Sequence, residues 1–408
     1  MTGPVGQGAA TQVAERPEHG PLGSARRRLR SGELGAWPVI LGLIIIWVVF
    51  QSLNDRFLTP QNLSNLTLQI AATGTISVGI VLVLLLGEID LSVGSVAGVA
   101  AAALAVLTVR HGVPDLIGIV LVLLFGAAIG LLQGTIFAKL GVPAFVVTLA
   151  GLLGWLGLQL YLLSPQGTIN IPYDGLIAKL THTNLSEAVG WVVGAVVVAL
   201  YAAAVLVDYR RRTAAGLPIR PTRANALRIA GLAVLVGAAV WVLNAWQGVP
   251  VALLIFVGLV AVTDLVLRRT RYGRSIYAVG GNAEAARRAG MNVAGIRISV
   301  FMLASMFAAL GGILTASRGY AAGQSTGAGD TLLIAIAAAV IGGVSLFGGR
   351  GSTWGALLGS LVLGSITSGM FLLQLESSVR YMITAAVLLA AVILDSLSRR
   401  GRRSSGRE

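Results

Sequence analysis

The chain has 408 residues, of which 56% are hydrophobic and only 11% are charged, and its formal net charge is +14. Soluble domains carry roughly 25% charged residues, so this composition excludes a soluble globular protein and predicts an all-α, polytopic bundle of about 10–12 membrane spans. Cysteine is absent and only three histidines occur. This excludes disulfides and thiolate metal sites and argues against a histidine cluster, so we expect neither a metal nor a cofactor.

The chain begins with a polar, basic tail, residues 1–36, which we expect to be disordered and cytoplasmic. The next hydrophobic run lacks a small-residue cleavage site, so it is interpreted as a retained first span. A membrane domain is predicted over 37–396 and a basic tail over 397–408. Twelve hydrophobic segments are predicted, at 37–53, 64–86, 91–109, 115–138, 144–163, 187–207, 226–245, 250–267, 295–317, 330–346, 353–374 and 379–396.

The distribution of basic residues predicts the orientation of these segments. If all twelve cross and the amino terminus is inside, all but five of the 30 Lys and Arg residues lie on the inner side. The five exceptions are Arg56, Arg110, Lys179, Arg318 and Arg380. Cytoplasmic loops are enriched in basic residues, so both termini are predicted to be cytoplasmic. Nucleic-acid binding is disfavoured, because no basic stripe is interleaved with stacking aromatic residues.

An acidic turn, GEIDLSVGS at residues 87–95, lies between the second and third segments. Carboxylates near membrane depth are costly and mark either a functional site or a stabilised helix break. In one interpretation, Asp90 or Ser92 caps the helix that leaves the turn. In the other, Glu88, Asp90 and Ser92 line a substrate pathway, as sugar-hydroxyl contacts or as a gating hinge. The residues alone leave both interpretations open.

A polar stretch, RRTRYGRSIYAVGGNAEAARRAGMNV at residues 268–293, is the longest polar interval in the second half of the chain. Gly280-Gly281 is interpreted as a breaker pair, after which a short helix begins. Asn282 is the expected N-cap of this helix and Gly290 its C-terminal stop.

The side chains of this short helix are suited to docking another protein. The helix dipole favours an acidic residue in the first turn and basic residues in the last, and alanines offer a smooth surface. The alternative is a solvated loop that only obeys the charge rule. The residues that carry the docking hypothesis are Asn282, Glu284, Ala285, Ala286, Arg287, Arg288 and Gly290.

A second glycine-interrupted stretch, IGGVSLFGGRGS at residues 341–352, has a pattern similar to the acidic turn. Paired stretches of this kind in corresponding halves of a chain point to a transport pathway, so Gly342 and Ser345 are also candidate pathway residues. Both stretches end segments that run in the same direction, whereas an inverted repeat needs opposite directions. Either the repeat is parallel or one segment does not cross. The overlay pairs Gly342 with Gly87, Leu346 with Leu91 and Gly349 with Gly94.

The chain lacks the usual phosphate-binding loop. A P-loop needs Gly-Lys followed by Ser or Thr, and both lysines, Lys139 and Lys179, follow alanine. If transport is driven by ATP, another subunit must bind the nucleotide.

Five stretches, taken together and in order, resemble the membrane permease subunits of bacterial ABC sugar importers of the ribose and xylose type. The extra loop and spans within 187–267 resemble the longer, xylose-type members. The five stretches are FLTPQNLSNL (57–66), GEIDLSVGS (87–95), GVPAFVVTLAGLLGWLG (141–157), YAVGGNAEAARRAGMNV (277–293) and VIGGVSLFGGRGSTWGALLG (340–359).

The resemblance implies a multi-pass subunit of the bacterial cytoplasmic membrane that imports a monosaccharide, such as a xylose-like pentose. It implies a paired or homodimeric permease, a separate ABC ATPase on the cytoplasmic side and an extracytoplasmic sugar-binding protein. The helix at 282–290 would be the coupling helix seated in the ATPase. Glu88 departs from the family pattern, in which most members have glycine, and adds a charge there.

Two other classes of function are considered. One is a proton-coupled secondary sugar transporter that uses Glu88 or Asp90 as a relay. The other is an integral membrane enzyme acting on lipid, against which no exposed catalytic acid–base pair recurs in the loops.

Overall fold

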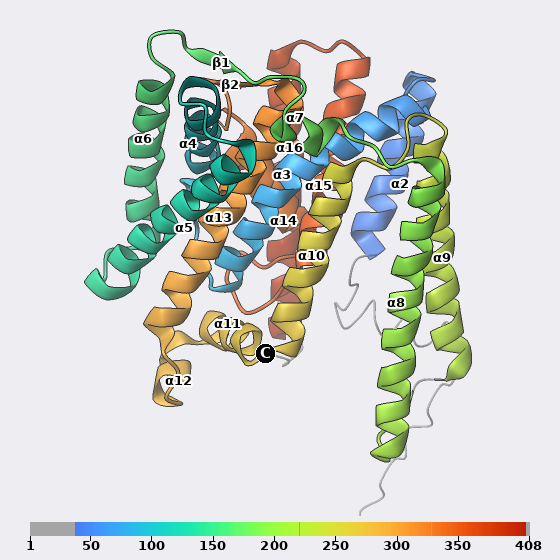
Figure 1. Ribbon diagram of the computed structural model, residues 1–408. Coiled ribbons are helices and arrows are strands. Elements are labelled where there is room, and N and C mark those ends of the chain that lie inside the picture. The colour runs from blue at the N-terminus through green and yellow to red at the C-terminus, as the bar shows by residue number, and fades with distance from the viewer. Residues whose placement is uncertain (1–36, 220, 328, 405–408) are drawn as a thin grey trace, which may run out of the picture. The chain divides into compact units, whose positions relative to one another are not determined.

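The computed structural model describes residues 37–219, 221–327 and 329–404, so the predicted tail 1–36 and residues 405–408 lie outside the described residues (Figure 1). The described chain is almost entirely helical. Its elements are α2 (Trp37–Leu53), α3 (Pro60–Leu85), α4 (Val93–Ala105), the π-helical turn η1 (Val106–Arg110), α5 (Asp115–Leu140), α6 (Ala144–Leu163), β1 (Thr168–Asn170), α7 (Leu176–His182), α8 (Glu187–Ala214), α9 (Thr222–Asn244), α10 (Val251–Arg269), α11 (Arg271–Gly281), α12 (Ala283–Arg288), α13 (Val293–Gly319), β2 (Ala321–Gly323), α14 (Thr331–Ile341), α15 (Thr353–Leu372) and α16 (Ser377–Ser404).

Within the described ranges, nine helices are long and apolar enough to cross a membrane. They are α3, the continuous α4–η1, α5, α6, α8, α9, α10, α13 and α15, and three shorter apolar helices lie in α2, α14 and α16. Each of the twelve predicted segments overlaps one of these helices, so the prediction of an all-α polytopic bundle is confirmed.

The connection between the predicted segments 187–207 and 226–245 is shorter than expected, because α8 continues to Ala214 and α9 begins at Thr222. Arginine and alanine are good helix formers, and an ion pair of 2.9 Å between Arg212 and Asp208 supports the last turns of α8. Hydropathy therefore predicted where the apolar part of the helix ends but not where the helix itself ends.

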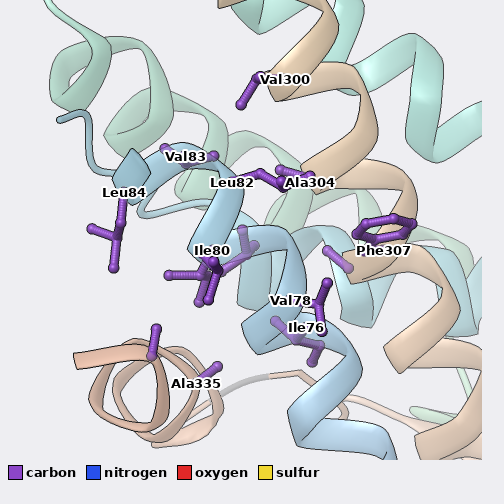
Figure 2. Packing of buried hydrophobic residues seen from close by; sticks show 14 of the residues in the cluster. Ile76, Val78, Ile80, Leu82, Val83, Leu84, Val300, Ala304, Phe307 and Ala335 are labelled. Carbon is purple, nitrogen blue, oxygen red and sulfur yellow. The ribbon is translucent and has the colours of Figure 1, made fainter. Parts of the chain in front are cut away.

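The centre of the bundle is α3. Every residue from Gly74 to Leu86 is buried, as expected of a helix that is apolar on all faces. Figure 2 shows side chains of α3 pointing to several sides, with Ala304 and Phe307 of α13 beside them. A Cβ at Gly79 would lie 2.8 Å from the Ala304 carbonyl oxygen, so glycine permits the two backbones to approach closely.

The helix α13 defines two ends of the described bundle. Its 27 residues span about 40 Å. It begins just after α12 and leads into β2, which pairs antiparallel with β1 so that Thr168 lies opposite Gly323. We call these the α12 end and the β1–β2 end, and they lie on opposite sides of the bundle in Figure 1.

Candidate transport pathway and docking helix

The helices α3 and α14 end in the same backbone turn. After α3, the N–H of Gly87 (φ +78°) donates to the Leu84 carbonyl (2.9 Å), and the N–H of Glu88 donates to the Val83 carbonyl (3.3 Å). This is a Schellman motif, in which a left-handed glycine ends the helix.

The turn after α14 repeats these bonds. The N–H of Gly343 (φ +89°) donates to the Val340 carbonyl (2.9 Å), and that of Val344 donates to the Ala339 carbonyl (3.1 Å). The structural equivalent of Gly87 is therefore Gly343, and the sequence overlay on Gly342 was wrong by one residue. The overlay matched residue types, whereas the turn is set by the residue that adopts positive φ.

The two turns lie side by side at the α12 end. The N–H of Gly349 donates to the Leu85 carbonyl at 2.9 Å. A Cβ at Gly87 would lie 3.2 Å from the Phe347 carbonyl oxygen. The helices α3 and α14 therefore end at the same place.

The helices α4 and α14 run in opposite directions, and each crosses only part of the bundle. α3 has 26 residues and spans about 39 Å, whereas the 18 residues of α4–η1 span about 27 Å and the 11 residues of α14 about 17 Å. α4–η1 ends at the β1–β2 end, where Arg110 donates to the Leu162 carbonyl (3.0 Å). Both helices therefore begin at intermediate depth.

The N-termini of these two partial helices meet. A Cβ at Gly94, in the first turn of α4, would lie 3.4 Å from Cβ of Leu332, in the first turn of α14. Helix N-termini present free N–H groups and partial positive charge. Discontinuous helices that meet near the membrane midplane commonly build the substrate sites of transporters, so this meeting point is the centre of the candidate pathway.

Asp90 lies just before α4 and is 3% exposed. Its Oδ1 accepts from the Ser92 N–H (2.8 Å) and from Ser92 Oγ (2.6 Å). Neither side chain caps the free N–H groups within α4, so the predicted cap is wrong; Asp90 instead closes a local turn on Ser92. Its Oδ2 is buried and has no hydrogen-bond partner in the described structure. An unpaired buried carboxylate oxygen is costly, and Asp90 is therefore the strongest candidate for contact with a polar solute.

Two polar side chains that no sequence pattern singled out, Gln133 and Trp155, extend this group, and Gln133 contacts the turn directly. Ser92 Oγ is 3.1 Å from Oε1 of Gln133, a buried residue of α5. Trp155 of α6 has a buried indole N–H without a described partner, as has the Nε2 of Gln133. A glutamine inside an apolar span is a signal in itself, but the residues with which it is grouped can be seen only in the structure.

Glu88 points to α13 instead of to Asp90. Its carboxylate lies 3.3 Å from Arg297, and both side chains are about one-fifth exposed (21% and 23%). The guanidinium of Arg297 also stacks on the Phe137 ring at 4.7 Å. Burial raises the pKa of Glu88, and the positive charge of Arg297 opposes that shift. Glu88 thus links the acidic turn to the first turns of α13.

Gly342 and Ser345 have partners in their own region of the chain. A Cβ at Gly342 would collide with the Gly355 carbonyl of α15, so Gly342 is a packing position. Ser345 Oγ accepts from the Phe347 N–H (3.2 Å). These contacts are made within the turn that follows α14 and with α15. The structure does not bring Gly342 and Ser345 into contact with Asp90 or Ser92.

Helix α11, which joins α10 to α12, has no counterpart among the predicted elements. The side chain of Thr270 caps it by accepting from the Gly273 N–H (3.1 Å). The predicted breaker pair, Gly280-Gly281, lies inside its last turn, so that prediction is wrong. A Cβ at Gly280 would collide with the Leu85 carbonyl and lie 2.9 Å from the Gly349 nitrogen. Glycine is needed here for close approach to both turns.

The short helix α12 is present as predicted. Asn282 accepts from the Ala285 N–H (2.9 Å), and Gly290 has φ +80° at the C-terminal stop. Ala286, however, is only 5% exposed and packs on its own chain, so the expectation that it faces a partner is wrong. Local sequence indicates where a helix lies, but its buried face depends on tertiary packing. The exposed face carries Ala285, Arg288 and Ala289.

The charges of α12 pair with one another. Glu284 lies 3.1 Å from Arg287 and 3.2 Å from Arg288, and all three side chains are more than half exposed. Such exposed pairs contribute little to stability, so these charges remain available to a partner.

Known proteins match almost all of this arrangement. The family model described as "Branched-chain amino acid transport system / permease component" matches residues 62–392. The chain belongs to this permease family. The xylose transport system permease protein XylH of Escherichia coli (strain K12) is 35% identical over 373 residues, 91% of this permease and 94% of the relative.

More distant relatives cover similar lengths. XylH of Haemophilus influenzae is 31% identical over 374 residues, 91% of this permease and 99% of the relative. The ribose import permease protein RbsC of Bacillus subtilis (strain 168) is 31% identical over 355 residues, 87% and 91% of the two chains. No solved structure matches the permease.

These findings confirm the resemblance to ribose- and xylose-type permeases. The permease is a transport subunit and a multi-pass protein of the bacterial cytoplasmic membrane, not an enzyme. A permease component implies two partners, an ATPase and a substrate-binding protein. The proton-coupled alternative is not favoured by these relatives.

Proposed function

We propose that this permease imports a monosaccharide, a xylose-like pentose or a related sugar, with energy from a separate ATPase. The similarity to the E. coli xylose permease over 91% of the chain supports the substrate class. The observation that carries the transport mechanism is the meeting of the α4 and α14 N-termini beside the buried Asp90.

The sugar path is proposed to pass the acidic turn. A sugar hydroxyl can donate to the Asp90 carboxylate, and Ser92 places a second hydroxyl beside it. Glu88 is proposed to act through its link to α13. Gly342 and Ser345 are proposed to shape the second turn, which moves together with the first because the two turns share a backbone hydrogen bond.

The ATPase is proposed to dock on α12, the coupling helix of residues 282–290. Its exposed face of Ala285, Arg288 and Ala289 offers small side chains and positive charge. Movement of α12 would reach the pathway through α11, whose Gly280 touches both turns, and through Arg297, which pairs with Glu88.

The α12 end and both termini are proposed to be cytoplasmic, with the sugar-binding protein at the β1–β2 end. The small number of basic residues left outside supports this orientation. A second copy of the permease is proposed to complete the pathway. The tails 1–36 and 397–408 are proposed to be basic cytoplasmic extensions.

The test is ATP-driven uptake into proteoliposomes that contain the permease with its co-purifying ATPase and sugar-binding protein. The probes are D-xylose, D-ribose and leucine, the last because the family description names branched-chain amino acids. We expect saturable pentose uptake that requires ATP and survives a protonophore. Leucine uptake in place of pentose uptake would overturn the substrate class, and ATP-independent uptake that the protonophore abolishes would overturn the mechanism.

A further inference from the structure

Among the buried side-chain atoms that have no hydrogen-bond partner in the described part of the chain, three belong to neighbouring elements around the acidic turn. They are Oδ2 of Asp90 in the acidic turn, Nε2 of Gln133 on α5 and Nε1 of Trp155 on α6. Asp90 is 3% exposed and Gln133 is 2% exposed. A membrane interior offers no water to satisfy such groups, so unpaired polar atoms there point to function.

Two of these atoms approach the same backbone position. A Cβ at Gly151 of α6 would lie 3.2 Å from Trp155 Nε1 and would collide with Gln133 Nε2. Glycine at this position therefore leaves room for two N–H groups. Through Ser92 Oγ, which is 2.6 Å from Asp90 and 3.1 Å from Gln133, the carboxylate belongs to the same group.

The unpaired oxygen of Asp90 does not depend on how the Gln133 amide is assigned. The two ends of an amide are assigned from their hydrogen bonds. Turning the amide by half a rotation lets its nitrogen donate to Ser92 Oγ and brings its oxygen to the side of the Trp155 indole N–H. Asp90 Oδ2 lacks a donor in both orientations.

We propose that Asp90, Gln133 and Trp155 form a hydroxyl-binding site that determines which sugars the permease carries. This inference rests on the proposed function and deepens it. A sugar hydroxyl both donates and accepts, so it can donate to Asp90 Oδ2 and accept from the indole N–H or from the Gln133 amide. The Asp90 carboxylate repels an anionic group in the same place, so the site selects neutral polyols over sugar acids and sugar phosphates.

The first variant is Trp155→Phe, which removes the N–H and keeps an aromatic ring beside Phe125, its edge-to-face neighbour at 6.4 Å. Loss of one such hydrogen bond corresponds to about fivefold to tenfold slower D-xylose uptake by the complete complex in proteoliposomes. Gln133→Met removes the amide and keeps the side-chain length, and we expect a loss of the same size. The matched control is Trp241→Phe on α9, where the side chain is 67% exposed, and uptake should not change.

Singly deoxygenated xyloses separate recognition from structural support. For each sugar, the Trp155→Phe rate is divided by the wild-type rate, so that selection by the binding protein cancels. We expect the ratio to return to one for the analogue that lacks the contacted hydroxyl and to stay low for the others. Unchanged uptake in both variants, or an equal loss for every analogue, would overturn the site. A wild-type complex that moves no pentose would instead overturn the proposed function.

Discussion

Asp90 and Glu88 are two residues apart in the sequence, but their carboxylates have different partners, so we expect them to have different roles. Glu88 has a cation within 3.3 Å, whereas Asp90 has hydrogen bonds to Ser92 on one oxygen and none on the other. The paired and partly exposed carboxylate of Glu88 connects the acidic turn to α13. A buried carboxylate with an open oxygen is available to a solute that brings its own donor.

This difference predicts unequal effects of substitution. Asp90→Ala is expected to lower ATP-driven D-xylose uptake by more than about tenfold, because a hydrogen bond to a charged group is among the stronger kinds. Glu88→Gly should cost about twofold to threefold, because a partly exposed ion pair contributes little. Uptake is compared at equal membrane levels of each variant. Normal uptake in both would mean that the acidic turn only packs the bundle.

The sequence identified Asp90 because a charge inside an apolar region is conspicuous. It did not identify Gln133 or Trp155, because these are single residues whose importance depends on a contact across 41 positions, from Ser92 to Gln133. Such a grouping follows from how α5 and α6 pack around the acidic turn, and no local pattern contains that information.

At the scale of elements, α12 presents a face that can be tested. Ala285→Trp places a bulky group on the exposed face and should prevent the ATPase from docking, while the permease inserts normally. We expect ATPase retention in detergent to fall about tenfold or more, because a groove that accepts alanine has no room for an indole.

The control lies one residue further on. Ala286 is buried in its own chain, so Ala286→Trp should overpack the permease, at about 1–3 kcal/mol, and lower its yield or melting temperature. Full ATPase retention by Ala285→Trp together with normal uptake would show that α12 is not the docking element.

The contact of α11 with the two turns predicts a different defect. In Gly280→Ala the new Cβ would collide with the Leu85 carbonyl, so the turns must shift away from α11. We expect the ATPase to remain bound while uptake falls by more than about tenfold, since a small misplacement can cost 10²-fold in rate. The neighbouring Gly281 has no atom within 4 Å of a Cβ, so Gly281→Ala should keep most of the activity. Equal behaviour of the two variants would exclude this route of coupling.

Sequence patterns predicted the spans and α12 but not α11 or the partial lengths of α4 and α14. Hydropathy measures apolar content and not depth, so a helix that begins halfway through the bundle looks like a complete span. In α11, Tyr272, Ile276 and Val279 recur at helical spacing. That signal was overridden by Gly280-Gly281, where glycine serves close packing and does not end the helix.

At the scale of the whole membrane domain, the distribution of basic residues between the two ends of the bundle predicts its orientation. The α12 end carries the α10–α12 stretch with six arginines, and Arg110 and Lys179 belong to elements near the β1–β2 end. If the positive-inside rule holds, the docking helix faces the cytoplasm, where ATP is available to a partner subunit.

Reporter fusions test this orientation directly. A reporter that is active only in the cytoplasm is inserted at Gly216, in the loop between α8 and α9, or at Gly167, beside β1. Both glycines have positive φ in exposed or half-exposed turns, so an insertion there leaves the helices intact. Two helices, α7 and α8, lie between Gly167 and Gly216. Of these two, only α8 is long enough to cross a membrane. The two sites should therefore report opposite sides, with Gly216 active and Gly167 silent. Activity at Gly167 with silence at Gly216 would invert the protein and place α12 outside, where no ATPase could reach it.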